Sequence, residues 1–544
     1  MAADNSGSRS PVPPGAPDAV ADPDTVREFR LPGLDCSFTR LAGPLPIHRA
    51  QVTRAQWRAA ASIVRSLGGR LVTLWGIDRR TSDGHFAVAV AYALNTGLVW
   101  LDLPLTDADT TSYPDLTATF FSAVRMQRAV ADLSGLTAAG AGDARPWVRH
   151  AAWPADYYPL RREPSGRERF AALDEQYPFV TVEGDGVHEI AVGPVHAGII
   201  EPGHFRFSVV GEKVLRLEER LGYTHKGIEK RFEAMRLAQG TRLAARVSGD
   251  STVAYGWAYC AAAEALCDGA VPERAQWLRA LALERERIAN HLGDLGALGN
   301  DAALSFGLAQ FSRLREAWLR RNHELVGHRL MMDWIVPGGV ASDLLASALE
   351  TMREDCDAVE AQVRNLESIY DAHAGLQDRF VGTGRIDAEL ARRLNLTGMA
   401  ARASGLQRDL RSDFGGVPYE AMQVRSARAA DGDVAARVAV RFAEVYESLR
   451  LVRNLAHALP AGATLAALDE PRARGCGAGW IEAWRGEVLV TIELDDRGLI
   501  LRAHCHDPSW QNWPALEHAV IGNIVPDFPL INKSFNLSYS GQDL

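Results

Sequence analysis

The sequence predicts an α+β N-terminal domain followed by a mainly α domain, a helical bundle with small peripheral β-sheets. Three observations lead to this prediction. Strand-like runs and one helix-like segment fill the first 165 residues. Long segments with apolar residues at helical spacing fill the middle of the chain. Strand-like runs return near the C-terminus. At 544 residues the chain exceeds one ordinary domain of roughly 100–200 residues, so two or more domains are expected.

We divide the chain into four segments. Residues 1–28 are polar and rich in Pro, and we expect a disordered leader because such a segment cannot bury a core. Residues 29–165 form the first domain. Residues 166–186 carry Arg, Glu, Gly and Pro and are interpreted as a linker. Residues 187–544 form the second domain. The start of the chain has neither a basic segment nor an apolar core, so it does not resemble a signal peptide.

The first domain combines three expected strands with one expected helix. The strands are Arg70–Asp78, His85–Tyr92 and Leu98–Leu103, and the helix is Thr117–Leu133. This order favours a small α+β domain. It contains no nucleophile–base pair and no glycine-rich phosphate loop, so we interpret it as a docking module.

The second domain opens with a hairpin-like region around Gly193–His196 and Glu201–Phe207 and continues with long helices. In the helix expected from Pro272 to Leu298, apolar residues recur at steps of three, four or seven and form one stripe. Glu284, Arg287 and His291 follow a more polar flank of that helix. The other expected helices are 309–330, 342–369 and 434–459, with Pro337–Gly339 breaking the pattern, and the expected final strands are 479–484, 487–494 and 498–504.

Composition excludes several classes of protein. The net charge of −9 at pH 7 argues against a general nucleic-acid binder, which usually carries a basic stripe. No run of about 18 apolar residues exists, so we expect no membrane-spanning helix. The six cysteines are scattered and form no Cys-x-x-Cys pair, which indicates a reducing, cytoplasmic compartment.

The run His504-Cys505-His506 has the composition of a metal site. It lies in an expected strand, where alternate side chains share a face. The two histidines would then point one way and Cys505 the other. This alternation favours a structural role over a metal site.

Several motifs, found in the right order, resemble one family. They are Gly193-Pro194-Val195-His196, His225–Lys230, Val271–Gln276, Pro337–Val340, Arg402–Gly405, Asp409–Arg411, Glu482–Glu487 and Pro526–Asp543. The second domain resembles the catalytic large subunit of energy-converting nickel-iron hydrogenases of the formate hydrogenlyase type. It is equally similar to the 49-kilodalton-type quinone-site subunit of respiratory complex I. The first domain resembles the 30-kilodalton-type subunit of complex I, through Trp75–Asp78 and Asp156–Arg162.

The resemblance implies where metal ligands would lie. The family places one Cys-x-x-Cys pair at Ser248 and Ser251 and a second pair at Ser538 and Gly541. A nickel-iron centre requires soft thiolates, and serine hydroxyls are poor substitutes. We therefore expect no nickel-iron centre, no metal ligand in this chain and no hydrogenase activity.

The resemblance to complex I implies a quinone site instead. There a His on the first hairpin and a Tyr near the first metal motif bind quinone. His196 or His204 would be that His, while Leu243 stands where the Tyr is expected. Because a quinone headgroup needs a hydrogen-bond donor at each carbonyl, Tyr223 or Tyr255 would have to replace it.

Other candidate residues follow from the same resemblance. Glu229 matches a proton-relay Glu, or alternatively forms a structural ion pair with Lys226 or Arg246. Arg485 matches an Arg that overhangs the cavity, with Trp484 in place of a Pro. The candidate catalytic residues are Glu229, His196 and Arg485; the candidate cofactor-binding residues are His196, His204, Arg246, Ser248, Ser251 and Ser538. For the serines a cavity-lining role without catalysis is favoured, since no base accompanies them in a nucleophile motif.

The resemblance thus implies a subunit of a membrane-associated, complex I-like or hydrogenase-like oxidoreductase. It would take part in electron transfer of the NADH–quinone type, coupled to ion translocation, with quinone as its cofactor. An iron-sulfur cluster is expected in a small partner subunit of the 20-kilodalton type, because this chain lacks clustered cysteines. The pair would dock on integral membrane subunits of the complex I or antiporter type, at the inner face of the cell membrane. The alternative is a non-redox scaffold with an inert cavity.

Overall fold

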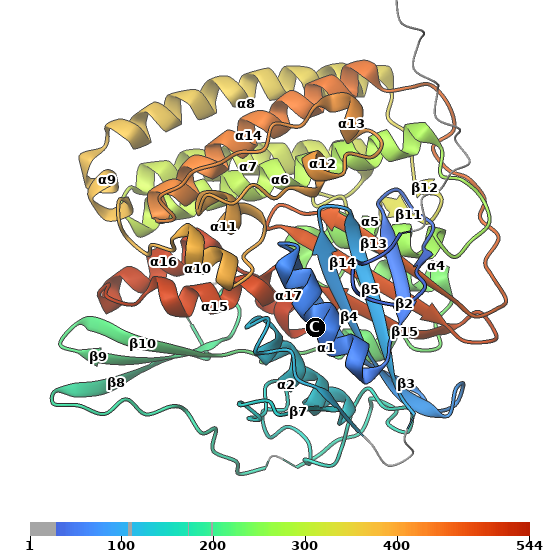
Figure 1. Ribbon diagram of the computed structural model, residues 1–544. Coiled ribbons are helices and arrows are strands. Elements are labelled where there is room, and N and C mark those ends of the chain that lie inside the picture. The colour runs from blue at the N-terminus through green and yellow to red at the C-terminus, as the bar shows by residue number, and fades with distance from the viewer. Residues whose placement is uncertain (1–28, 107–110, 172, 197–199) are drawn as a thin grey trace, which may run out of the picture.

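The computed structural model describes residues 29–106, 111–171, 173–196 and 200–544. The predicted leader, residues 1–28, lies outside them. Figure 1 shows a layer of long helices along one side of the molecule, with β-sheets beneath it. The α+β first part and the helical second part with small sheets are confirmed.

The first part forms a five-stranded sheet in the order β1-β2-β5-β4-β3, in which β2 and β5 run parallel and the other neighbours antiparallel. Its strands are β1 (Thr39–Arg40), β2 (Ile47–Gln51), β3 (Arg70–Arg79), β4 (His85–Leu94) and β5 (Gly97–Leu105). Helices α1 (Arg54–Ser66) and α2 (Ala123–Ser134) cover one face. Strands β3, β4 and β5 are nearly continuously buried because the other face of the sheet is covered too.

The second covering layer is the C-terminal sheet of β13 (Gly475–Glu482), β14 (Glu487–Leu494) and β15 (Ile500–His506). One core cluster joins Trp75 and Ala89 of the first sheet to Trp480 and Leu489 of the second. Two buried ion pairs cross the same interface. Arg70 contacts Glu487, and the Arg79 guanidinium donates to both carboxylate oxygens of Glu493 at 2.7 Å.

Helix α5 (Thr252–Glu264) packs on the far face of the C-terminal sheet at very short range. A Cβ added at Gly477 would lie 2.0 Å from the carbonyl oxygen of Ala262, and one at Gly479 would lie 1.9 Å from that of Ala258. These glycines are therefore required by the close approach of two backbones.

The helical layer consists of α6 (Glu273–Asp301), α7 (Ser305–Val326), α8 (Ala346–Ala372) and α14 (Val434–Ala458). These helices confirm the four long ones expected, with ends shifted by a few residues. The short strands β11 (Ile335–Val336) and β12 (Gly339–Val340) pair where the Pro-Gly-Gly break was expected. On α6 the structure buries the polar flank as well as the apolar stripe.

The helix expected from Thr117 begins instead at Ala123. The carboxylate of Asp115 accepts hydrogen bonds from the backbone N–H of Thr117 at 3.0 Å and from its hydroxyl at 2.6 Å. Such a local side-chain turn competes with the first helical turn and delays the helix.

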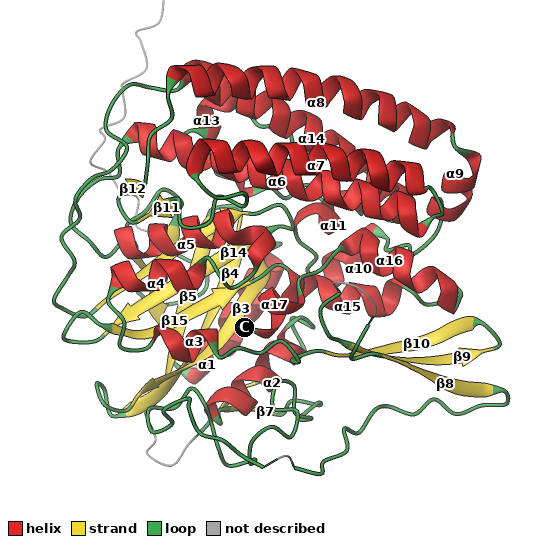
Figure 2. Ribbon diagram, turned by 180° about the vertical axis from the view of Figure 1, so that it is seen from behind, coloured by secondary structure: helices red, strands yellow, loops and turns green. Residues whose placement is uncertain are grey.

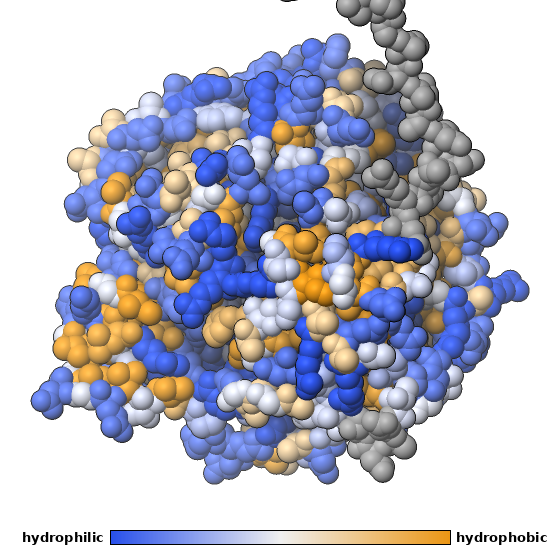
Figure 3. All heavy atoms as spheres, viewed as in Figure 1, coloured by the Kyte–Doolittle hydropathy of each residue, from blue (hydrophilic) through white to orange (hydrophobic). Residues whose placement is uncertain are grey.

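A third sheet of β8 (Val187–Val192), β9 (His204–Val210) and β10 (Lys213–Arg220) projects from the body, as Figure 2 shows. It is anchored through Phe205 and Phe207, whose rings each lie 4.9 Å from that of Phe528. Figure 3 shows apolar side chains gathered over this projecting region. The exposed apolar residues there are Val210, Leu215, Ile521 and Ile524.

The remaining elements are short, except for α15. They are β6 (Ser112–Pro114), β7 (Thr137–Ala139), α3 (Ile228–Phe232), α4 (Leu237–Ala244), η1 (Gly249–Ser251), α9 (Ala374–Phe380), α10 (Ala388–Arg393), α11 (Gly398–Ala403), α12 (Leu410–Asp413), α13 (Tyr419–Met422), α15 (Ser509–Ala519), η2 (Val525–Asp527), α16 (Phe528–Phe535) and α17 (Tyr539–Asp543). Across the described ranges, no helix combines the length and apolarity needed to cross a membrane.

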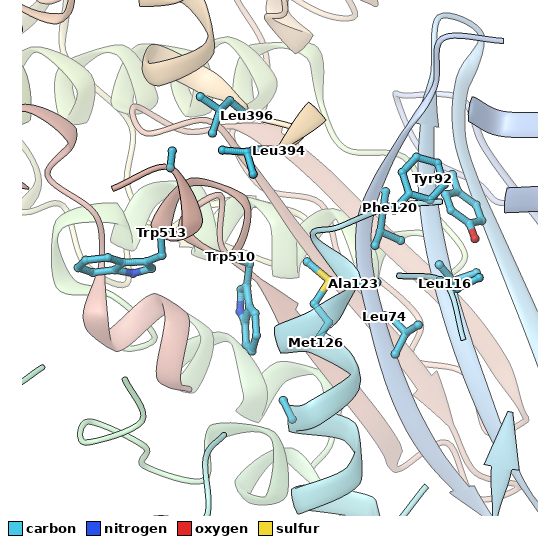
Figure 4. Close-up of a cluster of buried hydrophobic side chains, with 14 of the residues drawn as sticks. Leu74, Tyr92, Leu116, Phe120, Ala123, Met126, Leu394, Leu396, Trp510 and Trp513 are labelled. Carbon is cyan, nitrogen blue, oxygen red and sulfur yellow. The ribbon is translucent and has the colours of Figure 1, made fainter. Parts of the chain in front are cut away.

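The largest core cluster contains residues from both predicted domains. Figure 4 shows Leu74 and Met126 of the first part on one side, with Leu394 and Trp510 of the second part nearby. The two parts of the chain are therefore held by a shared core as well as by the two sheets.

Replacing Gly479 by Ala tests the contact between α5 and the C-terminal sheet. The new methyl would overlap the Ala258 carbonyl, so we expect the free energy of unfolding to fall by about 1–3 kcal/mol. Gly256→Ala is the matched control, because a Cβ at this position of α5 meets nothing within 4 Å. The control should be neutral or stabilise by about 0.5–1 kcal/mol. Denaturant unfolding measures both, and equal effects would contradict the close approach.

Candidate functional site

The structure brings together the two polar motifs that lie far apart in the chain. The hydroxyls of Ser248 and Ser538 are 3.0 Å apart, across 290 residues of sequence. Ser538 also accepts a hydrogen bond from the backbone N–H of Gly541 at 2.9 Å and so caps α17. Ser248 precedes the single turn η1. Both serines are almost fully buried, as is Ser251.

Asp250 is the centre of this cluster. Its carboxylate accepts hydrogen bonds from Ser248 Oγ at 2.8 Å and from Ser251 Oγ at 3.3 Å. The Arg485 guanidinium donates to both carboxylate oxygens, at 2.8 and 2.5 Å. Burial raises the pKa of Asp250, but the charge of Arg485 outweighs it, so the pKa lies below its ordinary value. Asp250 is a site residue that the sequence analysis missed, although it stands between the two serines.

A second carboxylate, Asp507, borders the cluster. Its Oδ2 accepts a hydrogen bond from the Tyr255 hydroxyl at 2.8 Å, and its Oδ1 accepts one from the Ser509 N–H at 2.9 Å. A Cβ at Gly541 would lie 2.3 Å from Asp507 Oδ2, so any side chain at that position would displace the carboxylate. Burial raises the pKa of Asp507.

Trp484 closes the cluster on another side. Its indole N–H donates to the backbone carbonyl of Asp250 at 2.9 Å and to Ser251 Oγ at 3.2 Å. The Arg485 guanidinium lies 3.9 Å from the centre of the Trp484 ring. The turn after β13 thus supplies both the indole of Trp484, which borders the cluster, and the guanidinium of Arg485, which is the counter-ion of Asp250.

The residues at the four positions implied for metal ligands do not fit a nickel-iron centre. Three are hydroxyls and the fourth has no side chain, whereas such a centre needs soft thiolates. Throughout the residues that the structure describes, no group of three or more His, Cys, Asp or Glu side chains could hold a metal ion.

Glu229 lies at a different place, on α3, where its side chain contacts β15. Its carboxylate accepts from Arg502 Nη2 at 2.7 Å, from His504 Nδ1 at 2.6 Å and from the Cys505 N–H at 3.2 Å. Burial raises the pKa of Glu229, but Arg502 and then His504 outweigh it and lower the pKa to about 2. This carboxylate is therefore ionised and paired at neutral pH.

The expectation that Glu229 pairs with Lys226 or Arg246 is wrong. The Lys226 amino group donates to the Val247 carbonyl at 3.4 Å. Arg246 forms a half-exposed ion pair with Asp333 and takes no part in the serine cluster. The actual partners come from β15, which packs against α3.

The alternation expected for His504-Cys505-His506 is present. His504 stacks on Trp75 of the first sheet at 4.7 Å and contacts the Thr73 hydroxyl at 2.7 Å. Cys505 is buried in the core cluster on the opposite face, beside α5. On β15, His504 therefore binds Glu229 on one face, and Cys505 packs in the core on the other.

The two candidate histidines lie at the root of the projecting sheet. His196 Nε2 is 2.8 Å from the Gly203 carbonyl oxygen, and His204 Nδ1 is 3.1 Å from that of Gly193. A Cβ at Gly203 would lie 2.6 Å from the Tyr539 ring, so this root contacts the tail next to Ser538. Burial lowers the pKa of His204.

The two candidate tyrosines are separated. Tyr255 is fully buried and bonded to Asp507 in the cluster, whereas Tyr223 is 39% exposed and packs against His150. The structure thus places Ser248, Ser251, Ser538, Arg485 and Tyr255 in one site, beside Asp250 and Asp507. Glu229 and Arg246 lie outside that site.

Sequence comparison finds relatives of this chain among known proteins. Residues 50–169 match the family described as the respiratory-chain NADH dehydrogenase 30 Kd subunit, and residues 294–475 match that of its 49 Kd subunit. Formate hydrogenlyase subunit 5 of Escherichia coli is 33% identical over 483 residues, which cover 88% of this chain and 85% of that protein. The chain belongs to the family of these subunits.

Other members of the family support the same assignment. Hydrogenase-4 component G of Escherichia coli is 32% identical, over 87% of this chain and 84% of its own length. An NADH-quinone oxidoreductase subunit of Thermosipho melanesiensis is 29% identical, over 63% of this chain and 96% of its own. A chain in the structure of a membrane-bound sulfane sulfur reductase, an archaeal respiratory membrane complex, shares the fold. It has a TM-score of 0.62 and 23% identity, over 66% of this chain and 99% of that one.

Glu229→Gln tests the ion pairs between α3 and β15. The folded-state pKa of about 2 lies below the ordinary value of 4.5, so the stabilisation is complete above pH 4.5 and is lost as the pH falls toward 2. We expect this contribution to reach about 3 kcal/mol at neutral pH. Unfolding free energies of both proteins should therefore converge between pH 4.5 and 2. A difference that does not change with pH would contradict the ionised pair.

Proposed function

We propose that this chain is a subunit of a membrane-associated oxidoreductase of the complex I and hydrogenase type, and that it has no hydrogenase activity. Family membership supports the first part. The observation that carries the second is the cluster of Ser248, Ser251 and Ser538 around the Asp250–Arg485 ion pair. It lies where the resemblance implies thiolate ligands, and a hydroxyl cannot bridge soft metals at neutral pH.

The proposed chemistry is electron transfer to a quinone. Reduction of a quinone to a quinol takes two electrons and two protons. The electrons would come from an iron-sulfur cluster in a small partner subunit, because the cysteines of this chain are scattered. Integral membrane subunits would complete the assembly at the inner face of the cell membrane and couple electron transfer to ion movement.

The cluster offers hydrogen-bond donors for a quinone headgroup. The Tyr255 hydroxyl and the Arg485 guanidinium lie in the same site, and His196 or His204 would approach from the root of the projecting sheet. Each carbonyl oxygen of a quinone accepts a hydrogen bond. Binding would require Tyr255 to exchange its bond to Asp507, or Arg485 one of its bonds to Asp250.

The second candidate function is a non-redox scaffold with an inert site. The observation that favours it is that Asp250 and Arg485 satisfy each other with two hydrogen bonds. A bidentate pair of this kind is strong and resists displacement. In this function the site stabilises the contact between the two motifs and binds nothing.

Metal analysis of the purified complex tests the first part of the proposal. We expect nickel well below one atom per copy of this chain, because no thiolate is available at the four positions. Formate hydrogenlyase subunit 5 of Escherichia coli, in its own complex, serves as the comparison. Stoichiometric nickel bound to this chain would overturn the proposal.

Quinone reduction by the complex with its co-purified partners separates the two functions. Tyr255→Phe and His196→Ala each remove one donor, so we expect each to lower turnover by about tenfold or more. Tyr223→Phe is the control, because this tyrosine lies outside the cluster. Turnover unchanged in both donor variants would support the scaffold function and contradict the quinone site.

A further inference from the structure

One face of α6 carries a row of buried polar residues. Glu284, Arg287, His291 and Asp294 recur at steps of three and four, which places them on one side of the helix. The first three are fully buried and Asp294 is 3% exposed. Charges in such surroundings must be paired or neutralised, because burying an unpaired charge costs far more than a hydrogen bond returns.

The N-terminal end of this row is satisfied by Arg411. Its guanidinium donates to both oxygens of Glu284, at 3.0 and 2.9 Å, and to both oxygens of Asp409, at 2.9 and 2.6 Å. Glu284 also accepts hydrogen bonds from the hydroxyls of Tyr419 at 2.8 Å and Ser448 at 2.6 Å. Two carboxylates thus share one guanidinium.

The middle of the row is organised by Arg402. It donates to Glu444 at 2.7 Å and to Glu482 at 2.9 Å, while His291 Nε2 lies 2.7 Å from Glu444. Arg287 lies between the two ends, 3.4 Å from Glu284 and 3.7 Å from Glu444. We call these groups the α6 charge cluster. Its members are Glu284, Arg287, His291, Arg402, Asp409, Arg411, Glu444 and Glu482.

The charges of the α6 charge cluster do not balance. Four carboxylates face three guanidiniums, and His291 is the only further titratable base in the cluster. Asp294 at the end of the row is already paired with Arg441 at 3.0 Å and does not change the balance. With a neutral imidazole the cluster would keep one uncompensated negative charge among buried side chains. Binding one proton removes that charge.

Glu482 is the carboxylate best placed to take the proton. It contacts Arg402 from α11 and the backbone N–H of Leu410 at 3.2 Å, and Asp409 and Arg287 face it from the loop before α12 and from α6. Burial and then Asp409 raise the pKa of Glu482 to about 7, against the effect of Arg402. Burial also lowers the pKa of His291, and the pKa of Glu444 lies well below its ordinary value because Arg402 and His291 outweigh its burial. Neither the His291 imidazole nor the Glu444 carboxylate is therefore favoured to take up this proton.

We propose that the α6 charge cluster is a proton-binding site, which holds one exchangeable proton on the Glu482 carboxyl near neutral pH. The site borders the serine cluster, since the Trp484 ring meets the His291 ring edge-on at 5.9 Å and its N–H bonds to the Asp250 carbonyl. A charge brought to Asp250 and Arg485 would change the proton affinity of Glu482 through the low-dielectric interior. The proton-binding site would be present whether or not a quinone accepts the electrons.

The first test compares the stability of the wild type with that of Glu482→Gln across pH. The folded protein keeps the proton up to a pKa of about 7, whereas an unfolded Glu releases it near the ordinary value of 4.5. The unfolding constant of the wild type relative to the variant should therefore rise about tenfold per pH unit between 4.5 and 7. Glu286→Gln is the control, because Glu286 is another buried carboxyl, on α6 but outside the α6 charge cluster. In this variant the pH-dependent contribution of Glu482 to stability should remain. A ratio of wild type to Glu482→Gln that is constant over this range would overturn the proposal.

The second test is infrared spectroscopy of the full-length chain, which detects the carbonyl stretch of a protonated carboxylic acid. The wild-type spectrum at pH 6 should contain a component that Glu482→Gln lacks, that disappears above pH 8 and that Glu482→Asp restores. Burial raises the pKa of Glu286 to about 8, so the Glu286→Gln control removes a separate component. If Glu482→Gln does not fold, the proposal is tested by the pH titration of the carboxyl band in the wild type and in Glu482→Asp. Absence of a carboxyl component that titrates near pH 7 in both would overturn the proposal.

Discussion

The packing of the N-terminal sheet against the C-terminal sheet is the contact on which the rest of the structure depends. It buries both faces of β3, β4 and β5, and it encloses the Arg70–Glu487 and Arg79–Glu493 pairs. An Arg–Glu pair buried this way is costly unless both partners are present, so each sheet stabilises the other. The same packing places β15 beside α3, and thereby His504 and Arg502 around Glu229.

The C-terminal sheet also determines the candidate site. Trp484 and Arg485 lie in the turn between β13 and β14, and Asp507 directly follows β15. The segments that follow β13 and β15 therefore place the Arg485 guanidinium and the Asp507 carboxylate beside the serine motifs. Because α5 lies against this sheet through Gly477 and Gly479, Tyr255 on the same helix reaches Asp507. One rigid unit of sheet and helix thus positions most of the polar groups of the site.

The serine cluster and the α6 charge cluster are two neighbouring buried polar clusters of different kinds. In the serine cluster a bidentate ion pair and hydroxyls satisfy one another. In the α6 charge cluster the acids outnumber the guanidiniums, and the balance depends on a proton. The difference matters for function, because a balanced pair resists change, whereas an unbalanced cluster responds to a charge placed nearby.

The sequence by itself determined the order of elements, the long helices and the strands near both ends, because apolar periodicity reflects local burial. It also indicated that Ser248 and Ser538 belong together, through motifs typical of one family. Only the tertiary structure decided the partners of the charged side chains. Asp250 and Asp507 were missed, and Glu229 was assigned the wrong cations, because their partners lie hundreds of residues away in the chain. Likewise, the polar flank of α6 looked like an exposed surface pattern as easily as a buried one. The spacing of apolar residues can be read within one segment of sequence. An ion pair between distant residues forms only when the fold brings their charged groups within about 3 Å of each other.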